Sequence, residues 1–336
     1  MNKKLIAVAL AALPVAAMAD VTLYGKIKMG VENVKEGDSS SVNRIDDIGT
    51  RIGFKGSEDL GNGLKAIWQV EQKVSIDDKG AAGGTWASRD SFLGFQGDFG
   101  KVKFGRLSTF QNSDMEDVDP YEYGNNAMGL GTFTRNDGRV NNAVRYDSPE
   151  FAGFNATVLY GADETAGVNK DTWNLGLGYK FDAFFAKYSY LRQNSQNPAA
   201  DKDNQSHRVE AGYSANNLLV AVGYQQTKSY VTAAGDSLAF NIGSAVAGDE
   251  VKDREAVLTV AYTMGALTPK LSLAKGWDVK VDGDKESDTG YKQYVVGVDY
   301  ALSKRTVLGA QYGKLNFDGG SSDDIRAFGV NAVHSF

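Results

Sequence analysis

The sequence contains no cysteine, only two histidines and only five prolines among its 336 residues. Without cysteine no disulfide framework can form, and two histidines alone are too few for a zinc site with three or four nitrogen or sulfur ligands. We therefore expect neither a metal nor another cofactor. The scarcity of proline favours many long strands, because proline cannot donate a hydrogen bond to a sheet.

Long apolar runs are also absent beyond the first 19 residues. Lys3 and Lys4 precede an apolar stretch that ends in the small-x-small pattern Ala17-Met18-Ala19, which is typical of a signal peptidase site. We expect residues 1–19 to be a cleaved signal peptide and residues 20–336 to form the mature β-barrel. Loss of the two lysines changes the net charge from −6 to −8. Nucleic-acid binding needs a basic face, which a chain with this much negative charge lacks. We therefore expect no nucleic acid as a partner.

Strict alternation of apolar residues with polar or small ones dominates the chain. In residues 172–181, polar or glycine positions alternate with Trp173, Leu175, Leu177, Tyr179 and Phe181. We count sixteen such segments. The apolar row from Tyr294 to Tyr300 spans about 20 Å at about 3.3 Å per residue, which is close to the roughly 25 Å apolar band of an outer-membrane barrel.

Short and long connections alternate regularly between these segments. The short ones carry turn residues, as in 58–63 and 215–217, whereas long polar loops are expected at 193–205 and 230–253. Tight turns at one end and long loops at the other are typical of outer-membrane barrels, and a soluble sandwich or propeller has no reason for them. The sequence therefore predicts an all-β, 16-stranded antiparallel transmembrane barrel, closed because an open edge is prohibitive in hydrocarbon. An even strand number places both termini in the periplasm.

Several segments resemble Gram-negative general porins. They are residues 20–26 (DVTLYGK), 50–64 (TRIGFKGSEDLGNGL), 105–107 (GRL), 144–149 (VRYDSP) and the terminal Phe336, while 64–72 (LKAIWQVEQ) and 334–336 (HSF) are most similar to the neisserial type. The resemblance covers the whole mature chain. It implies a homotrimer in the outer membrane of a Gram-negative bacterium, surrounded by lipid, with water-filled channels for ions and small hydrophilic solutes. It also implies that the third external loop folds into each lumen.

The third long loop, residues 110–140, contains five acidic residues, namely Asp114, Glu116, Asp117, Asp119 and Glu122. Alternation places Lys26, Lys28, Arg51 and Arg145 on the inner face of their strands. The porin pattern assigns the basic wall of the pore constriction to Lys26, Arg51, Arg106 and Arg145, and its loop acids to Asp117 and Glu122. The spacing of the acids departs from the family pattern near Pro120, which leaves the second acid open.

Arg106 conflicts with simple alternation, which places it beside Val102 and Phe104 on the lipid face. A bare arginine at the bilayer midplane of a barrel costs about 2–4 kcal/mol. We therefore expect a bulge or a strand end that turns Arg106 inward.

Arginines on one wall that face carboxylates on a loop create a field across the channel, and fixed charges of this kind bias which ions and polar solutes enter. The same pairs would serve equally well to hold the loop in place. The basic wall favours a weak anion preference.

Two other classes of function are compatible with an outer-membrane barrel. A barrel hydrolase needs a serine and a histidine together on its outer wall, but the chain has only His207 and His334, and His334 shares the outward row of Phe336. We therefore expect no enzyme. An adhesin that uses the long external loops cannot be separated from a channel by sequence, whereas a conductance measurement separates them.

Overall fold

The computed structural model describes residues 21–77, 86–123, 125–166, 170–197, 202–231, 245–319 and 322–336. The expected signal peptide, residues 1–19, lies outside the described part of the chain. The elements are β1 (Thr22–Glu36), β2 (Val42–Asp47), β3 (Arg51–Gly61), β4 (Leu64–Lys73), β5 (Ser91–Gly97), β6 (Gly100–Ser108), α2 (Phe110–Asp114), β7 (Arg139–Asp147), β8 (Phe154–Gly161), β9 (Thr172–Phe181), β10 (Phe184–Asn197), β11 (Lys202–Ala215), β12 (Leu218–Tyr230), β13 (Glu250–Tyr262), β14 (Leu267–Gly276), β15 (Lys280–Val281), β16 (Asp284–Lys285), β17 (Tyr291–Ala301), β18 (Thr306–Phe317) and β19 (Ile325–Ser335).

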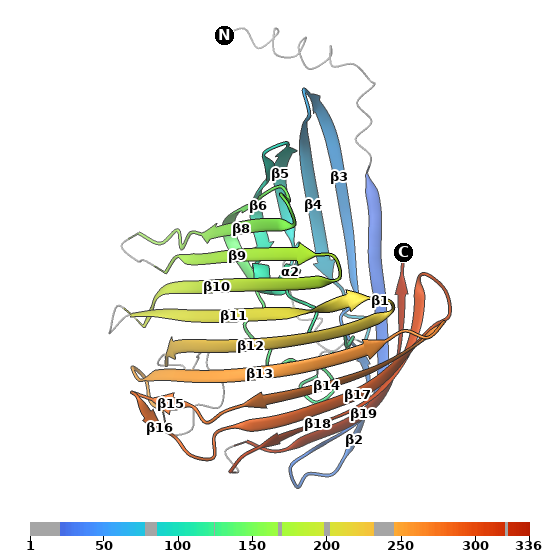
Figure 1. Ribbon diagram of the computed structural model, residues 1–336, viewed down its shortest axis with the longest axis vertical. Helices are drawn as coiled ribbons and strands as arrows, with labels where there is room; N and C mark the ends of the chain where they lie inside the picture. The colour runs from blue at the N-terminus through green and yellow to red at the C-terminus, as the bar shows by residue number, and fades with distance from the viewer. Residues whose placement is uncertain are drawn as a thin grey trace.

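These strands form one closed antiparallel barrel, as predicted (Figure 1). β2 and β3 both pair with β1 and together make one strand of the wall, and β15 pairs with β16 in the connection that follows β14, so the described residues contribute sixteen wall strands. β19 pairs with β1 from Ser335 opposite Lys26 to Ile325 opposite Glu36. Beyond this ladder, the Gly25 N–H donates to the Phe336 carbonyl at 3.2 Å and the Phe336 N–H donates to the Gly25 carbonyl at 3.1 Å.

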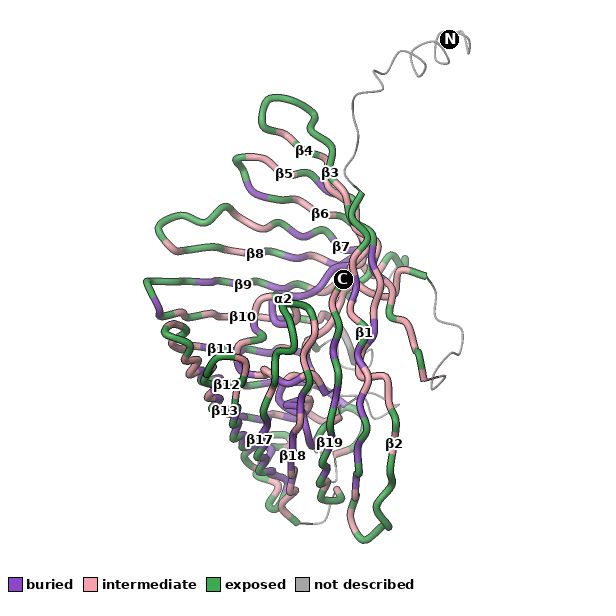
Figure 2. Tube along the Cα trace, turned by 90° about the vertical axis from the view of Figure 1, so that its right-hand side faces the viewer, coloured by how far each residue is buried: buried purple, intermediate pink, exposed green. Residues whose placement is uncertain are grey.

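Alternation along each strand separates an apolar outer face from a polar inner face, and exposed and buried positions alternate in Figure 2. On β9 the five apolar residues of the predicted row are 36% to 67% exposed, whereas Asn174 between them is 1% exposed. Aromatic rings pack against each other at both ends of the β8–β9 pair. Phe154 and Tyr179 are stacked with centroids 4.1 Å apart, and Tyr160 and Trp173 are tilted with centroids 4.7 Å apart. Two aromatic girdles that flank an apolar band are the signature of a wall that faces lipid.

Among the described residues, no helix is both long enough and apolar enough to cross a membrane.

The short connections have the backbone geometry that their residues predict. Asn62, Asp182 and Asn216 have φ of 53°, 54° and 52°, a left-handed conformation that asparagine and aspartate tolerate in tight turns. The extent of one long loop is wrong, because β10 continues to Asn197 and β11 begins at Lys202, inside the predicted loop 193–205. Polar side chains do not end the pairing of two strands, because the backbone N–H and carbonyl groups still form hydrogen bonds beyond the apolar band of the wall. Of the predicted loop 230–253, residues 232–244 lie outside the described residues.

The connection between β6 and β7 (residues 109–138, hereafter the β6–β7 connection) packs against inward-facing residues of the wall. The Tyr121 hydroxyl donates to the Val295 carbonyl at 2.8 Å, and the Tyr123 hydroxyl donates to the Val330 carbonyl at 2.7 Å. Phe133 is fully buried in an apolar cluster with wall residues such as Val257. Figure 1 shows α2, which begins this connection, on the inner side of the wall.

Candidate functional site: charged groups inside the barrel

Glu122 of the β6–β7 connection faces two lysines of β1. Its carboxylate lies 2.6 Å from the Lys28 Nζ and 3.7 Å from the Lys26 Nζ. Arg51 of β3 is directly opposite Lys26 in the register, and all four side chains line a cavity of about 540 Å³. Burial alone would raise the pKa of Glu122, but Lys28 and Lys26 more than compensate and hold that pKa below its usual value. The structure thus brings three predicted residues, Lys26, Arg51 and Glu122, to one cavity.

Arg51 also lies close to a second carboxylate, that of Glu71. Its Nε lies 3.9 Å from a carboxylate oxygen of Glu71, which also accepts a hydrogen bond from the Tyr24 hydroxyl at 3.0 Å and pairs with Arg89. Arg51 therefore stands between Glu71 on the wall and the acids of the β6–β7 connection.

Arg145 of β7 is 4% exposed and joins the wall to the start of the β6–β7 connection. Its guanidinium donates to Asp114 at 2.8 Å, to the Ser113 hydroxyl at 2.7 Å, to the Ser108 carbonyl at 2.8 Å and to Asp147 at 2.7 Å. Arg145 thus contacts both the wall and the β6–β7 connection, an arrangement that fits the second of the two roles expected for the basic wall.

Asp117 lies apart from Glu122. It pairs with Lys187 of β10, whose Nζ also donates to the Asp114 carbonyl at 2.5 Å. Asp114, Asp117 and Lys187 line a different cavity of about 420 Å³ together with Phe110. The two predicted loop acids therefore face different parts of the wall.

The structure does not bring Arg106 to the loop acids. The expected bulge is present as a register shift between Gly105 and Leu107 against β7. The Arg106 Nε donates to the Ser88 carbonyl at 2.9 Å, and its Nη1 donates to the Asn141 Oδ1 at 2.5 Å. Because β6 ends at Ser108, the guanidinium finds its partners at the strand end instead of in the ion-pair clusters.

The sequence placed Lys28 on the inner face of its strand but assigned neither Lys28 nor Lys187 to the pore constriction, although a signal for both exists. Each follows the alternation rule, since Lys28 lies between outward Ile27 and Met29, and Lys187 lies between Ala186 and Tyr188. The acids that they meet are distant in the chain, so their pairing follows only from the path of the β6–β7 connection.

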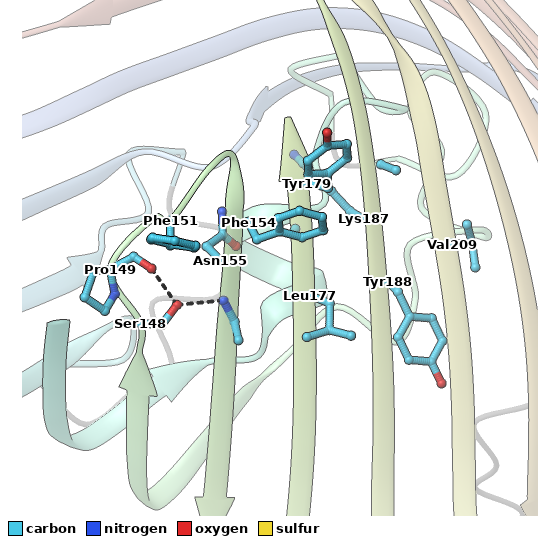
Figure 3. A pocket seen from close by; sticks show the side chains of 13 residues that line it. Ser148, Pro149, Phe151, Phe154, Asn155, Leu177, Tyr179, Lys187, Tyr188 and Val209 are labelled. Atoms are coloured by element: carbon cyan, nitrogen blue, oxygen red, sulfur yellow. Dashed lines mark hydrogen bonds between the residues drawn. The ribbon is translucent and has the colours of Figure 1, made fainter. Parts of the chain in front are cut away.

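The outer wall carries an apolar groove of about 530 Å³ near the short turn that precedes β8 (Figure 3). Phe151, which is 81% exposed, and Phe154 form one side, and Leu177 and Tyr188 lie across from them. The Ser148 hydroxyl is used locally, because it donates to the Pro149 carbonyl at 2.9 Å. The apolar lining of this groove suits contact with hydrocarbon. The charged side chains that could bind polar solutes lie inside the barrel.

Comparison with known proteins agrees with this geometry. A sequence profile described as Gram-negative porin matches residues 7–320. The major outer membrane protein P.IB of Neisseria meningitidis (serogroup B / serotype 15, strain H44/76) is 40% identical over 349 residues, which cover 100% of both chains. An anion-selective porin from Comamonas acidovorans has a similar fold, with a TM-score of 0.77 at 23% identity over 95% of this chain and 100% of that one.

A second fold match is the trimer form of OmpT, an outer membrane protein of Vibrio cholerae, with a TM-score of 0.69 at 17% identity over 95% of this chain and 99% of that one. The profile match and the neisserial relative each span nearly the whole chain, and they agree with the closed barrel. The chain belongs to the Gram-negative porin family and is a general-diffusion porin of the outer membrane.

Proposed function

We propose that passage through this porin is controlled where Lys26, Lys28 and Arg51 face Glu122 across the cavity of about 540 Å³. The observation that carries the proposal is the placement of one loop carboxylate within 3.7 Å of two wall lysines. Positive charge on the wall and negative charge on the β6–β7 connection create a transverse field there. Ions and dipolar solutes respond to such a field, and apolar solutes gain nothing from it.

We propose further that the β6–β7 connection narrows the channel and is held by two ion-pair anchors. Arg145 pairs with Asp114, and Lys187 pairs with Asp117. The buried contacts of Tyr121 and Tyr123 with the wall support a fixed position for this segment. A rigid connection keeps its carboxylates at constant distance from the wall, which a selective field requires.

Three other expectations belong to the same proposal. The mature chain starts at Asp20 after cleavage of residues 1–19, which N-terminal sequencing of the purified protein tests. It assembles as a homotrimer, which the trimer form of the Vibrio cholerae structure and the closed symmetry of most homo-oligomers support. It catalyses no reaction, and its partners are ions, small hydrophilic solutes and the surrounding lipid.

The direct test is the reversal potential of single channels in a planar bilayer with a salt gradient. Arg51→Gln removes one positive charge from the cavity wall, and we expect the permeability ratio to shift toward cations. Lys285→Gln is the matched control, because Lys285 lies on the external β15–β16 hairpin. An unchanged reversal potential for Arg51→Gln would remove this residue from the selective region. A wild-type protein that leaves bilayers non-conducting would refute the channel itself.

A further inference from the structure

The inner wall carries a group of small residues, hereafter the seat, among longer polar side chains. The seat lies on the neighbouring strands β18, β19 and β1, which run side by side in Figure 2. It consists of Gly30, Gly313, Ala327 and Gly329, all of them buried. Gly313 pairs directly with Ala327, and Gly329 follows two residues further along the same face of β19. Because no side chain of the seat is larger than a methyl group, other groups can approach the backbone of the wall closely here.

Residues 125–130 of the β6–β7 connection, hereafter the docked turn, pack on the seat. Ala127 and Met128 are fully buried and share an apolar cluster with Ala327. A Cβ atom on Gly313 would overlap the Ala127 carbonyl oxygen and would lie 2.6 Å from its carbonyl carbon, whereas ordinary contact begins at 3.4 Å. Both atoms belong to the backbone of the docked turn, so neither can rotate away. The docked turn therefore lies this close to the wall only because residue 313 is glycine.

The ring of Tyr123, shortly before the docked turn, fits against the other two glycines of the seat. A Cβ atom on Gly329 would lie 2.6 Å from the Tyr123 Oη, and one on Gly30 would lie 2.8 Å from the Tyr123 Cζ. Between these two positions the hydroxyl donates to the Val330 carbonyl of β19 at 2.7 Å. The ring is 4% exposed and packed on all sides. A methyl group at either glycine would therefore push Tyr123 away from the wall.

Two glutamines of the wall complete this attachment. The Gln293 Nε2 of β17 donates to the carbonyl oxygens of Asn126 at 2.6 Å and Gly129 at 2.8 Å, and the Gln311 Nε2 of β18 donates to the Met128 carbonyl at 2.8 Å. Both glutamines are 3% exposed. Buried carbonyl groups need such partners, because an unpaired one costs free energy. The docked turn is thus held without any charged group, unlike the two ion-pair anchors.

We infer that Gly313 and Gly329 are positioning residues that set the size limit of the channel for uncharged hydrophilic solutes. This inference rests on the proposed role of the β6–β7 connection in narrowing the channel. The two glycines fix how closely the docked turn and Tyr123 approach the wall, and every ångström between them and the wall is lost from the lumen. A methyl group at either position therefore narrows the channel and leaves its charged groups in number and sign as they were.

The test is the swelling of liposomes that contain the protein in solutions of an uncharged pentose or disaccharide. A shift of the docked turn by about 1 Å narrows a channel of about 5 Å radius by about 0.5 Å on average. Because the centre of a solute must stay its own radius away from the wall, entry of a disaccharide of about 4 Å radius falls about threefold, and entry of a pentose of about 3 Å radius falls about 1.4-fold. For Gly313→Ala we therefore expect the disaccharide-to-pentose ratio of swelling rates to fall about twofold.

The matched control is Gly309→Ala, on the same strand and the same inner face as Gly313. A Cβ atom there would meet only the side chain of Asn331, which can move, and it would not touch the docked turn. We expect this variant to keep the wild-type ratio.

A second pair of variants tests the contact of Gly329 with Tyr123. Gly329→Ala is expected to lower the ratio in the wild-type background. In a Tyr123→Leu background the same change should have little further effect, because leucine lacks the hydroxyl that the new methyl group meets. Such coupling reports a direct contact, and a general loss of stability would instead add to the effect of Tyr123→Leu.

The inference is overturned if Gly313→Ala and Gly329→Ala assemble and keep the wild-type ratio, if Gly309→Ala lowers the ratio as much, or if Gly329→Ala acts equally in both backgrounds. In each case a conducting channel leaves the proposed function standing. Should neither glycine variant assemble, Gln311→Leu decides the matter. It deprives the Met128 carbonyl of its partner, so the docked turn should drift into the lumen and lower the ratio, and an unchanged ratio would overturn the inference. A wild-type protein that passes neither ions nor sugars would overturn both proposals.

Discussion

Replacement of Glu122 by glutamine removes the acid that faces Lys26 and Lys28 while it preserves the volume of the side chain. A sphere of the cavity's volume of about 540 Å³ has a radius of about 5 Å, which sets the distance between an ion at its centre and a charge on its wall. In water-like surroundings a unit charge at about 5 Å changes the energy of an ion by about 0.8 kcal/mol. Screening at physiological salt, with a Debye length of about 8 Å, reduces this to about 0.4 kcal/mol.

That energy changes the local concentration of a monovalent ion about twofold, in opposite directions for anions and cations. The anion-to-cation permeability ratio of Glu122→Gln should therefore be about fourfold higher than that of the wild type. Reversal potentials of single channels at pH 7.5 in a potassium chloride gradient measure this ratio. Glu286→Gln makes the same chemical change in the external connection between β14 and β17 and should leave the ratio unaltered. If both variants behave alike, the field at this cavity does not govern selectivity.

Two further predictions concern the anchors of the β6–β7 connection. Arg145→Gln should remove the basic partner of Asp114 and one of the two basic partners of Asp147, which keeps Lys103 at 2.8 Å. Because Asp114 is 37% exposed, the cost should be smaller than the roughly 3–5 kcal/mol of a broken buried pair. We expect a lower unfolding temperature in detergent and noisier single-channel currents, and an unchanged melting curve would argue against an anchor. Lys187→Met should release Asp117 as an uncompensated charge and shift the reversal potential toward cations. A shift toward anions would contradict this reading of the pair.

The barrel could be predicted from sequence because its signal is local. The alternation in β9, from Trp173 to Phe181, fixes which face meets hydrocarbon without knowledge of any neighbour. The inward direction of Lys26 and Arg51 follows from the same rule. The extent of β10 and β11 could not be predicted, since their polar ends read as loop while their backbones remain paired.

The candidate site could be predicted only in part, because it depends on the path of the β6–β7 connection. The sequence identified Glu122 and Asp117 but gave no means of placing them against different walls. The environment of Asp137 is set by Arg208, a residue of a strand far along the chain. For Arg106 the family pattern was misleading. It predicted a place at the pore constriction, whereas the guanidinium is hydrogen-bonded to Ser88 and Asn141 near the end of β6.

The ladder between β1 and β19 has a consequence for how the chain matures. The backbone N–H and carbonyl of Gly25 are hydrogen-bonded only after Phe336 is in place. The first strand of the chain therefore remains partly unpaired until the last strand has been inserted. Until then two ribbons of unsatisfied amides and carbonyls are exposed, a state that hydrocarbon penalises heavily. Insertion and closure must therefore proceed as one concerted event, and a chain truncated by even a few residues at its end would remain an aggregation-prone intermediate.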